Sequence, residues 1–149
     1  MTASEVKAAI GEKKFKYYFK FCVEREPVDK CISHFCMLKN SGLHNAENHD
    51  LSWERYLENG SFPIDTKKYT NNKGKLIVNR IVRFERLNEG LREIASTLRF
   101  DFEHLSVKEK AGFREEIKVT DQQRSLIYEA FAPSNRLTGY DLLRASDAL

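Results

Sequence analysis

The sequence predicts an α/β fold, helix-rich, with a small, partly parallel sheet and several helices. Three observations predict it: short segments rich in β-branched and aromatic residues, apolar positions at helical spacing between and after them, and helix-capping residues ahead of several apolar stripes. The chain has 149 residues, with 10 Phe, 6 Tyr and 1 Trp, which is enough to fill one core. We therefore expect a single domain over residues 1–149.

The N-terminal residues predict a short helix followed by a strand. Thr2 and Glu5 form a capping box ahead of an apolar stripe, and Gly11 is placed to end the helix. Residues 17–23 are apolar or aromatic at nearly every position, which is typical of a strand buried on both faces. The chain then reaches Pro27, which suits the first turn of a helix because its missing N–H costs nothing there.

The region after this strand predicts a helix and then a long excursion. Apolar positions recur at helical spacing from Val28 through Leu38 and give one apolar face. Residues 41–74 show weak periodicity, apart from a short predicted helix at 52–57. Excursions of this kind often carry substrate contacts.

The second half of the chain begins with strand segments and ends with helices. Residues 75–78 and 80–84 are rich in β-branched and apolar side chains. An apolar stripe over residues 87–98 predicts a helix with Asn88 near its N-cap. Two capping boxes follow, and the second predicts a helix that Pro133 ends; the boxes are Ser106 with Glu109 and Thr120 with Gln123.

Charge and cysteine content exclude several classes of protein. A balance of 25 Lys and Arg against 22 Asp and Glu predicts no nucleic-acid partner, so any anion site is local. Cys22, Cys31 and Cys36 lack the spacing of a disulfide framework or a zinc site, so we expect a cytoplasmic protein with reduced thiols, Cys31 and Cys36 packing as small hydrophobes. No apolar run approaches the roughly 20 residues that span a bilayer, and the histidines show no metal-ligand spacing, so we expect no membrane and no metal.

The most informative stretch joins the first predicted strand to the helix that follows it. Arg25 lies at the C-terminal end of that strand, where open α/β sheets bind ligands, and Ser33 lies eight residues later. A guanidinium donates two charge-assisted hydrogen bonds to a phosphate, and a serine hydroxyl adds a third donor. One phosphate reaches both side chains only if it lies beside the helix. The alternative is a surface arginine and an incidental helical serine.

This stretch resembles the PAPS-dependent sulfotransferases, in particular their carbohydrate-type relatives. In that family a strand ending in Arg-x-Pro, followed by a helix with a serine eight residues after the arginine, binds the 3′-phosphate of PAPS; Arg25, Pro27 and Ser33 match this pattern. Residues 80–87 resemble the family's later strand, which ends in an aromatic residue and a glutamate before a helix. The resemblance implies binding of PAPS or adenosine 3′,5′-bisphosphate, with Arg114 as the preferred further basic residue.

The family's loop for the 5′-phosphosulfate has no counterpart in this sequence. The family carries a Gly- and Lys-rich loop after an N-terminal strand, whereas residues 11–15 precede the first predicted strand and contain one glycine. The resemblance therefore implies a P-loop-type sulfotransferase fold that is truncated at its N-terminus. We favour a truncated coding sequence; a nucleotide-binding remnant and a subunit completed by another chain also fit.

The resemblance also leads to expectations about function. The protein derives from an enzyme that transfers a sulfuryl group to a hydroxyl acceptor, retains the 3′-phosphate site and is inactive alone, because the groups that orient and stabilise the leaving group are missing. The alternative is a noncatalytic interaction or nucleotide-binding domain that inherited only the fold. For Glu85, at a strand end, we expect a structural ion pair with a neighbouring arginine rather than catalysis; a place in the wall of the site is the alternative. The sheet edge where the missing strand belonged would favour homo-oligomers.

Overall fold

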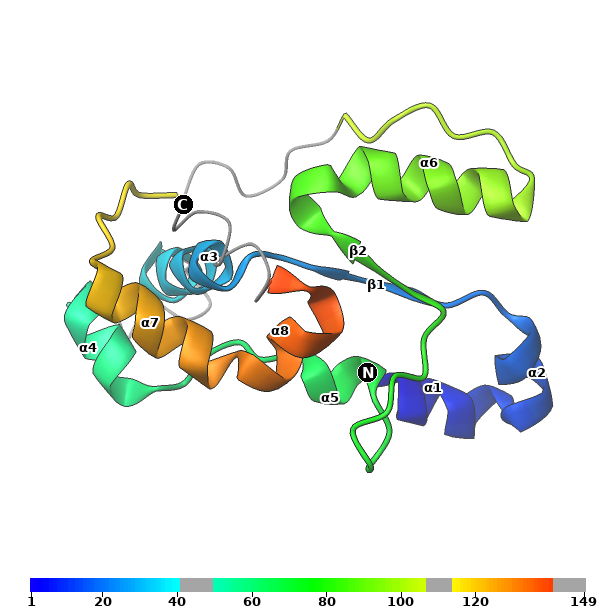
Figure 1. Ribbon diagram of the computed structural model, residues 1–149, viewed down its shortest axis with the longest axis horizontal. Helices are drawn as coiled ribbons and strands as arrows, with labels where there is room; N and C mark the ends of the chain where they lie inside the picture. The colour runs from blue at the N-terminus through cyan, green and yellow to red at the C-terminus, as the bar shows by residue number, and fades with distance from the viewer. Residues whose placement is uncertain (41–49, 107–113, 141–149) are drawn as a thin grey trace. The chain divides into compact units, whose positions relative to one another are not determined.

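The computed structural model describes residues 1–40, 50–106 and 114–140 (Figure 1). The prediction of a helix-rich α/β fold with a small parallel sheet is confirmed. The elements are α1 (Ala3–Ile10), α2 (Glu12–Tyr17), β1 (Phe21–Glu24), α3 (Pro27–Asn40), α4 (Trp53–Asn59), α5 (Thr66–Tyr69), β2 (Arg80–Arg83), the 3₁₀ turn η2 (Phe84–Arg86), α6 (Leu87–Leu98), α7 (Asp121–Ala130) and α8 (Ala132–Thr138). No helix in the described ranges is both long enough and apolar enough to cross a bilayer.

The chain divides into two compact units. The first unit comprises Met1–Arg25, Ile64–Leu105 and Pro133–Leu149, and the second comprises Glu26–Pro63 and Ser106–Ala132. The first contains the sheet, and the second contains a helical core.

The sheet of the first unit consists of β1 and β2, which run parallel. Their residues pair one for one, beginning with Phe21 opposite Arg80. Asn79 stabilises the N-terminal end of the β1–β2 pairing. Its side-chain oxygen accepts the Lys20 N–H at 3.0 Å, and its backbone N–H donates to the Lys20 carbonyl at 2.7 Å. A side chain at a strand entrance therefore helps to set the register.

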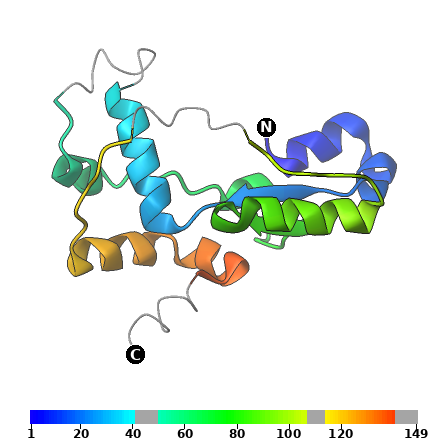
Figure 2. The same ribbon diagram turned by 90° about the horizontal axis from the view of Figure 1, so that it is seen from above.

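Helix α6 lies over the sheet and packs on β2 (Figures 1 and 2). Gly90 allows this close approach, because a Cβ at position 90 would lie 2.5 Å from Cγ1 of Val82. Val82 is only 2% exposed. Its registered neighbour on β1, Val23, is 42% exposed, so the helix covers the β2 side of this face and leaves the β1 side open.

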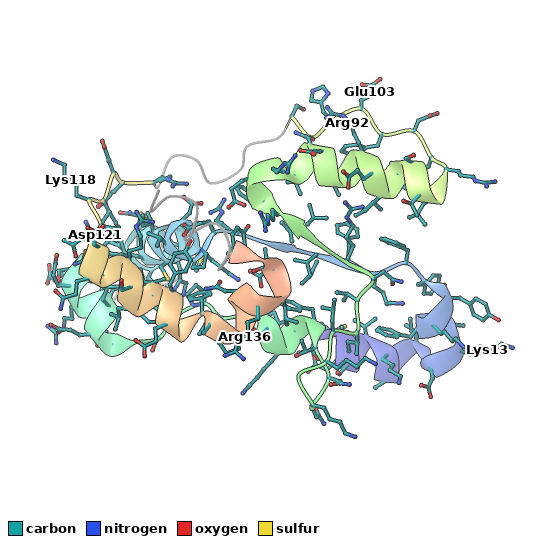
Figure 3. All side chains as sticks on the ribbon, viewed as in Figure 1. Lys13, Arg92, Glu103, Lys118, Asp121 and Arg136 are labelled. Atoms are coloured by element: carbon teal, nitrogen blue, oxygen red, sulfur yellow. The ribbon has the colours of Figure 1, made fainter. Side chains whose placement is uncertain are left out.

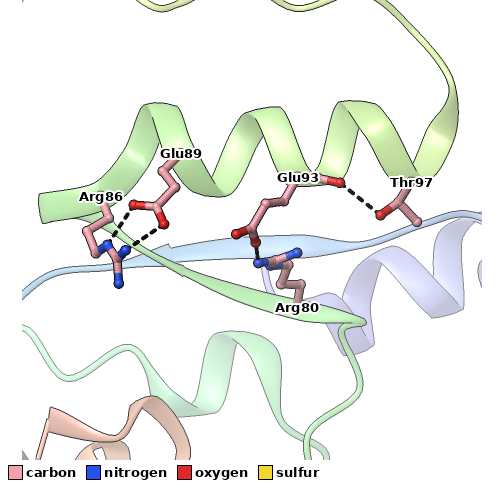
Figure 4. A network of polar contacts seen from close by, with 5 residues as sticks. All are labelled: Arg80, Arg86, Glu89, Glu93 and Thr97. Atoms are coloured by element: carbon pink, nitrogen blue, oxygen red, sulfur yellow. Dashed lines mark hydrogen bonds and ion pairs between the residues drawn. The ribbon is translucent and has the colours of Figure 1, made fainter.

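Charged side chains lie along the junction of β2 and α6 (Figure 4). Arg80 of β2 forms an ion pair with Glu93 of α6, and Arg86 pairs with Glu89 at 2.5 Å. The Thr97 hydroxyl donates to the Glu93 carbonyl at 2.8 Å. A cleft of about 200 Å³ opens at this junction, and the charged side chains that line it include both ion pairs. The Arg80–Glu93 pair ties the helix to the strand beside the glycine contact, whereas the Arg86–Glu89 pair is local to the start of the helix.

The segment after α6 returns along the helix. The Asn88 side chain accepts the Leu105 N–H at 2.7 Å, and Arg92 Nε donates to the Glu103 carbonyl at 3.3 Å (Figure 3). Asn88 lies near the N-cap of α6, as predicted, two residues after the N-cap position. Arg86 occupies the N-cap position, and its side chain makes no capping hydrogen bond. Asn88 instead holds the returning chain.

The predicted strand over residues 17–23 is shorter than expected and is not buried on both faces. Helix α2 includes Tyr17, so the strand begins only at Phe21. Tyr17 is 78% exposed and Phe21 is 44% exposed. The prediction failed because the first residue of this segment continues α2 and because the described elements leave the side of β1 that carries Phe21 and Val23 exposed. The capping box of α1 is confirmed.

Residues 75–78 were predicted as strand, and that prediction is wrong. Leu76 makes a single isolated bridge with Thr70. Between them Asn71 organises a turn, because its side-chain oxygen accepts the N–H groups of residues 73 and 75 at 3.0 and 2.9 Å. Gly74 supplies the positive φ of 72° that this turn needs.

The core of the second unit forms where α3, α4 and α7 pack together. The helices at 27–40 and near 52–57 confirm the predictions for those segments. The capping box of Thr120 and Gln123 at α7 is also confirmed, whereas the box at Ser106 includes Glu109, which lies outside the described residues. Helix α7 ends before Pro133, which lies in the first turn of α8. The buried core residues are Val28, Cys31, Phe35, Cys36, Trp53, Tyr56, Leu57, Ile127, Tyr128 and Phe131.

Candidate functional site

Arg25 follows β1 directly, as the sequence predicts, and its guanidinium lies over the ring of Phe84, the residue that follows β2. The last registered pair of the sheet is Glu24 with Arg83, so Arg25 and Phe84 are the next residues of two parallel strands. The Arg25 guanidinium carbon lies 3.7 Å from the centre of the Phe84 ring. This is a close cation–π stack. It places the arginine at the carboxyl end of the sheet, where ligands bind in α/β proteins.

The residues on either side of Phe84 are anchored by the last residue of α8 and by Tyr140, which follows that helix. Arg83 donates from Nε and Nη2 to the Thr138 carbonyl at 3.2 and 2.9 Å. The Tyr140 hydroxyl donates to the Glu85 carboxylate at 2.6 Å. Both neighbours of Phe84 are therefore held by residues 138–140, which belong to the same unit.

Tyr140 is the best-buried member of this arrangement, at 2% exposure. Its hydroxyl also lies 3.2 Å from the Glu24 carbonyl, and the Arg83 guanidinium lies 4.9 Å from its ring centre. Burial first, and then the Glu85 carboxylate, raises the pKa of Tyr140 well above its usual range, so the phenol remains a hydrogen-bond donor. The predicted pairing of Glu85 with an arginine stays a prediction.

A second buried tyrosine lies in the same unit. The Tyr69 hydroxyl is 3.1 Å from the Ser134 hydroxyl, and both residues are buried. Burial raises the pKa of Tyr69 above its usual range. Glu24 is also buried, at 2% exposure, so the unit encloses several polar side chains close to its short sheet.

The other predicted site residues, Ser33 and Arg114, lie in the second unit. Arg114 forms an ion pair with Asp29 on α3. Asp29 and Ser33 are four residues apart on this helix, so they share one of its faces. The structure thus brings Arg114 to the side of α3 that carries Ser33. Glu26 caps the start of the helix by accepting the Asp29 N–H at 2.7 Å.

The cysteines and a histidine of the second unit have structural surroundings. Cys31 and Cys36 are 0% and 1% exposed, which confirms that they pack as small hydrophobes. Burial raises the pKa of Cys31 to about 12, so its thiol stays protonated and unreactive at neutral pH. His34 Nδ1 lies 3.0 Å from the Tyr56 hydroxyl. Within residues 1–40, 50–106 and 114–140, no three His, Cys, Asp or Glu side chains gather as metal ligands would.

Sequence reasoning identified Arg25 and missed the residues that surround it. Tyr140 contacts Glu85 across 55 residues of chain, and Arg83 reaches Thr138 across the same separation. No local sequence pattern predicts such long-range contacts. The parallel register of β1 and β2 would have made Phe84 the expected neighbour of Arg25, but it requires that the ends of both strands are known. Comparison with models of protein families, with curated proteins and with solved structures found no match.

Proposed function

We propose that this chain is a sulfotransferase-like protein that binds the 3′-phosphate of PAPS or adenosine 3′,5′-bisphosphate through Arg25. The observation that carries the proposal is the position of Arg25 at the carboxyl end of a parallel strand, stacked 3.7 Å from the Phe84 ring centre. The sequence pattern of Arg25, Pro27 and Ser33 supports the same ligand, because it resembles the family's 3′-phosphate motif.

The chemistry of the arginine suits this role. A guanidinium is planar, carries its N–H groups in its plane and presents only its face to an aromatic ring. Stacking on Phe84 engages the face of Arg25, and the N–H groups with which a guanidinium binds phosphate oxygens lie in its plane. A stacked arginine at a strand end is better suited to a phosphate than an unstacked surface arginine.

The proposal assigns binding, and no transfer, to the isolated chain. Sulfuryl transfer requires donors for the negative charge that develops on the leaving phosphate, and it requires a base for the acceptor hydroxyl. The resemblance attributes the first of these to a Gly- and Lys-rich loop that the sequence lacks. We infer that the ancestral acceptor was a hydroxyl of a carbohydrate or another small molecule.

Calorimetric titration of the full chain with adenosine 3′,5′-bisphosphate tests the proposal. A charge-assisted contact contributes about 1.5 to 3 kcal/mol, so Arg25→Ala should weaken binding by about tenfold or more. Arg124→Ala is the matched control, because Arg124 is an exposed arginine on α7 and alanine is a good helix former. Absence of binding, or equal affinity for wild type and Arg25→Ala, would overturn the proposal.

The second candidate function is a noncatalytic interaction domain. The exposed apolar side chains of β1 favour it, since Phe21 and Val23 lie on one face of the strand at 44% and 42% exposure. The same titration separates the two functions. The titration also includes Ser33→Ala and Arg114→Ala. If the chain is an interaction domain, neither substitution should affect nucleotide affinity.

A further inference from the structure

The geometry points to Phe84 as a positioning residue for Arg25. Phe84 is in turn held in place by residues 138–140. This inference rests on the proposed function, because it concerns how Arg25 is prepared to meet a phosphate. It adds residues that the sequence motif does not contain. Phe84 acts through Arg25, and Tyr140 acts through Glu85.

The first step is the stack itself. An arginine side chain at the surface samples many rotamers, and ordering a side chain of this type on binding costs about 0.5 to 1.5 kcal/mol, or about twofold to tenfold in affinity. Because the register brings Arg25 and Phe84 side by side, the ring holds the guanidinium before a ligand arrives. Part of the ordering cost is then already met in the free protein.

The second step is that Phe84 is fixed by its neighbours rather than by burial. Phe84 is 42% exposed and is not among the buried core residues of the described part of the chain. Its backbone lies in η2, between Arg83, which is bonded to the Thr138 carbonyl, and Glu85, which is bonded to Tyr140. Side chains before and after the ring thus anchor it to one turn of the chain.

The third step is the fit of that turn against the strand end. Gly139 has a φ of 73°, and a Cβ there would lie 2.8 Å from Nη2 of Arg83. The glycine therefore lets the chain pass close to the guanidinium while the Thr138 carbonyl accepts its hydrogen bonds. Tyr140 then follows directly and reaches Glu85. The turn is built to contact both neighbours of Phe84 at once.

The test compares adenosine 3′,5′-bisphosphate with 5′-AMP, which lacks the 3′-phosphate. Phe84→Leu keeps an apolar side chain and removes the ring, so it should weaken bisphosphate binding by about twofold to tenfold and leave 5′-AMP binding unchanged. Phe84→Tyr keeps the ring and should keep the wild-type preference for the bisphosphate over 5′-AMP. Tyr140→Phe removes only the hydroxyl and should lower this preference, as Phe84→Leu does. Phe100→Leu, at an aromatic residue 53% exposed, is the control.

A double mutant separates positioning from a general structural effect. If Phe84 acts through Arg25, Phe84→Leu should have no further effect on the preference for the 3′-phosphate in the Arg25→Ala background. The inference is overturned if Phe84→Leu lowers the preference for the 3′-phosphate equally in the wild-type and Arg25→Ala backgrounds. It is also overturned if Phe84→Leu leaves this preference unchanged while Arg25→Ala abolishes it. In those two cases the proposed function stands. An unchanged preference in Arg25→Ala overturns both. Thermal unfolding of each variant shows whether it is folded.

Discussion

The contact between Gly90 and Val82 supports a prediction in which two effects of opposite sign compete. Replacing an interior helical glycine by alanine stabilises a helix by about 1 kcal/mol. At position 90, however, the new Cβ would meet Cγ1 and Cγ2 of Val82 at 2.5 and 3.3 Å. Overpacking of this kind costs about 1 to 3 kcal/mol, and a short β-branched side chain has little freedom to move away. We therefore expect Gly90→Ala to destabilise the packing of α6 on β2 by about 0 to 2 kcal/mol.

The decisive measurement is the same substitution in a Val82→Ala background. There the clash is removed, so Gly90→Ala should stabilise the helix by up to about 1 kcal/mol, and the sign of its effect should reverse. The coupling between the two sites should be about 1 to 3 kcal/mol. Amide hydrogen exchange over residues 80–98 is the suitable assay, because it reports the free energy of local opening for β2 and α6.

A control in the same helix isolates the propensity term. Ser96 is exposed on α6, so Ser96→Ala changes helix propensity without entering the sheet contact, and it should stabilise by a few tenths of a kcal/mol, roughly. The reasoning would be refuted if Gly90→Ala stabilised the wild-type chain as it does the Val82→Ala chain. That result would mean that the helix is free to move away from the strand at no cost.

Two further predictions follow from burial and exposure. Cys31 is 0% exposed and its pKa is raised to about 12, so its alkylation by iodoacetamide should stay slow from pH 7 to pH 9. The partly exposed Cys22 should react first. Mass spectrometry of the folded protein would contradict this prediction if Cys31 were modified as fast as Cys22. Because Phe21 and Val23 are exposed on β1, self-association measured by sedimentation should rise with protein concentration and should fall in Val23→Lys. A wild-type chain that stays monomeric at all concentrations would exclude an interface through these two residues.

Local signals predicted α1, α3, α4, α6 and α7, whereas α2, α5 and α8 were not foreseen. The capping boxes at Thr2 and Thr120 mark true helix starts, and Pro27 begins α3 as its missing N–H allows. These features act within one turn of helix, so the sequence alone contains the hydrogen-bonding partners. The small parallel sheet was also foreseen in kind, because strand-like segments alternate with helical ones.

The predictions failed where burial depends on distant chain. Residues 17–23 have strand composition, yet the first of them continues α2 and Val23 remains exposed. Residues 75–78 have strand composition too, but the turn organised by Asn71 leaves them without a strand partner, apart from one bridge. Composition reports the tendency of a segment to be extended; a partner strand and a covering helix decide whether it becomes a sheet.

The candidate site divides in the same way. The sequence by itself determined Arg25 at the end of a strand, the turn at Pro27 and the helix that carries Ser33, because each depends on neighbours a few residues away. Only the tertiary structure decided that Phe84 stacks on Arg25 and that Tyr140 holds Glu85, since strand register and contacts across 55 residues bring these groups together. Local chemistry thus determined the candidate residue Arg25, and long-range packing determined its neighbours.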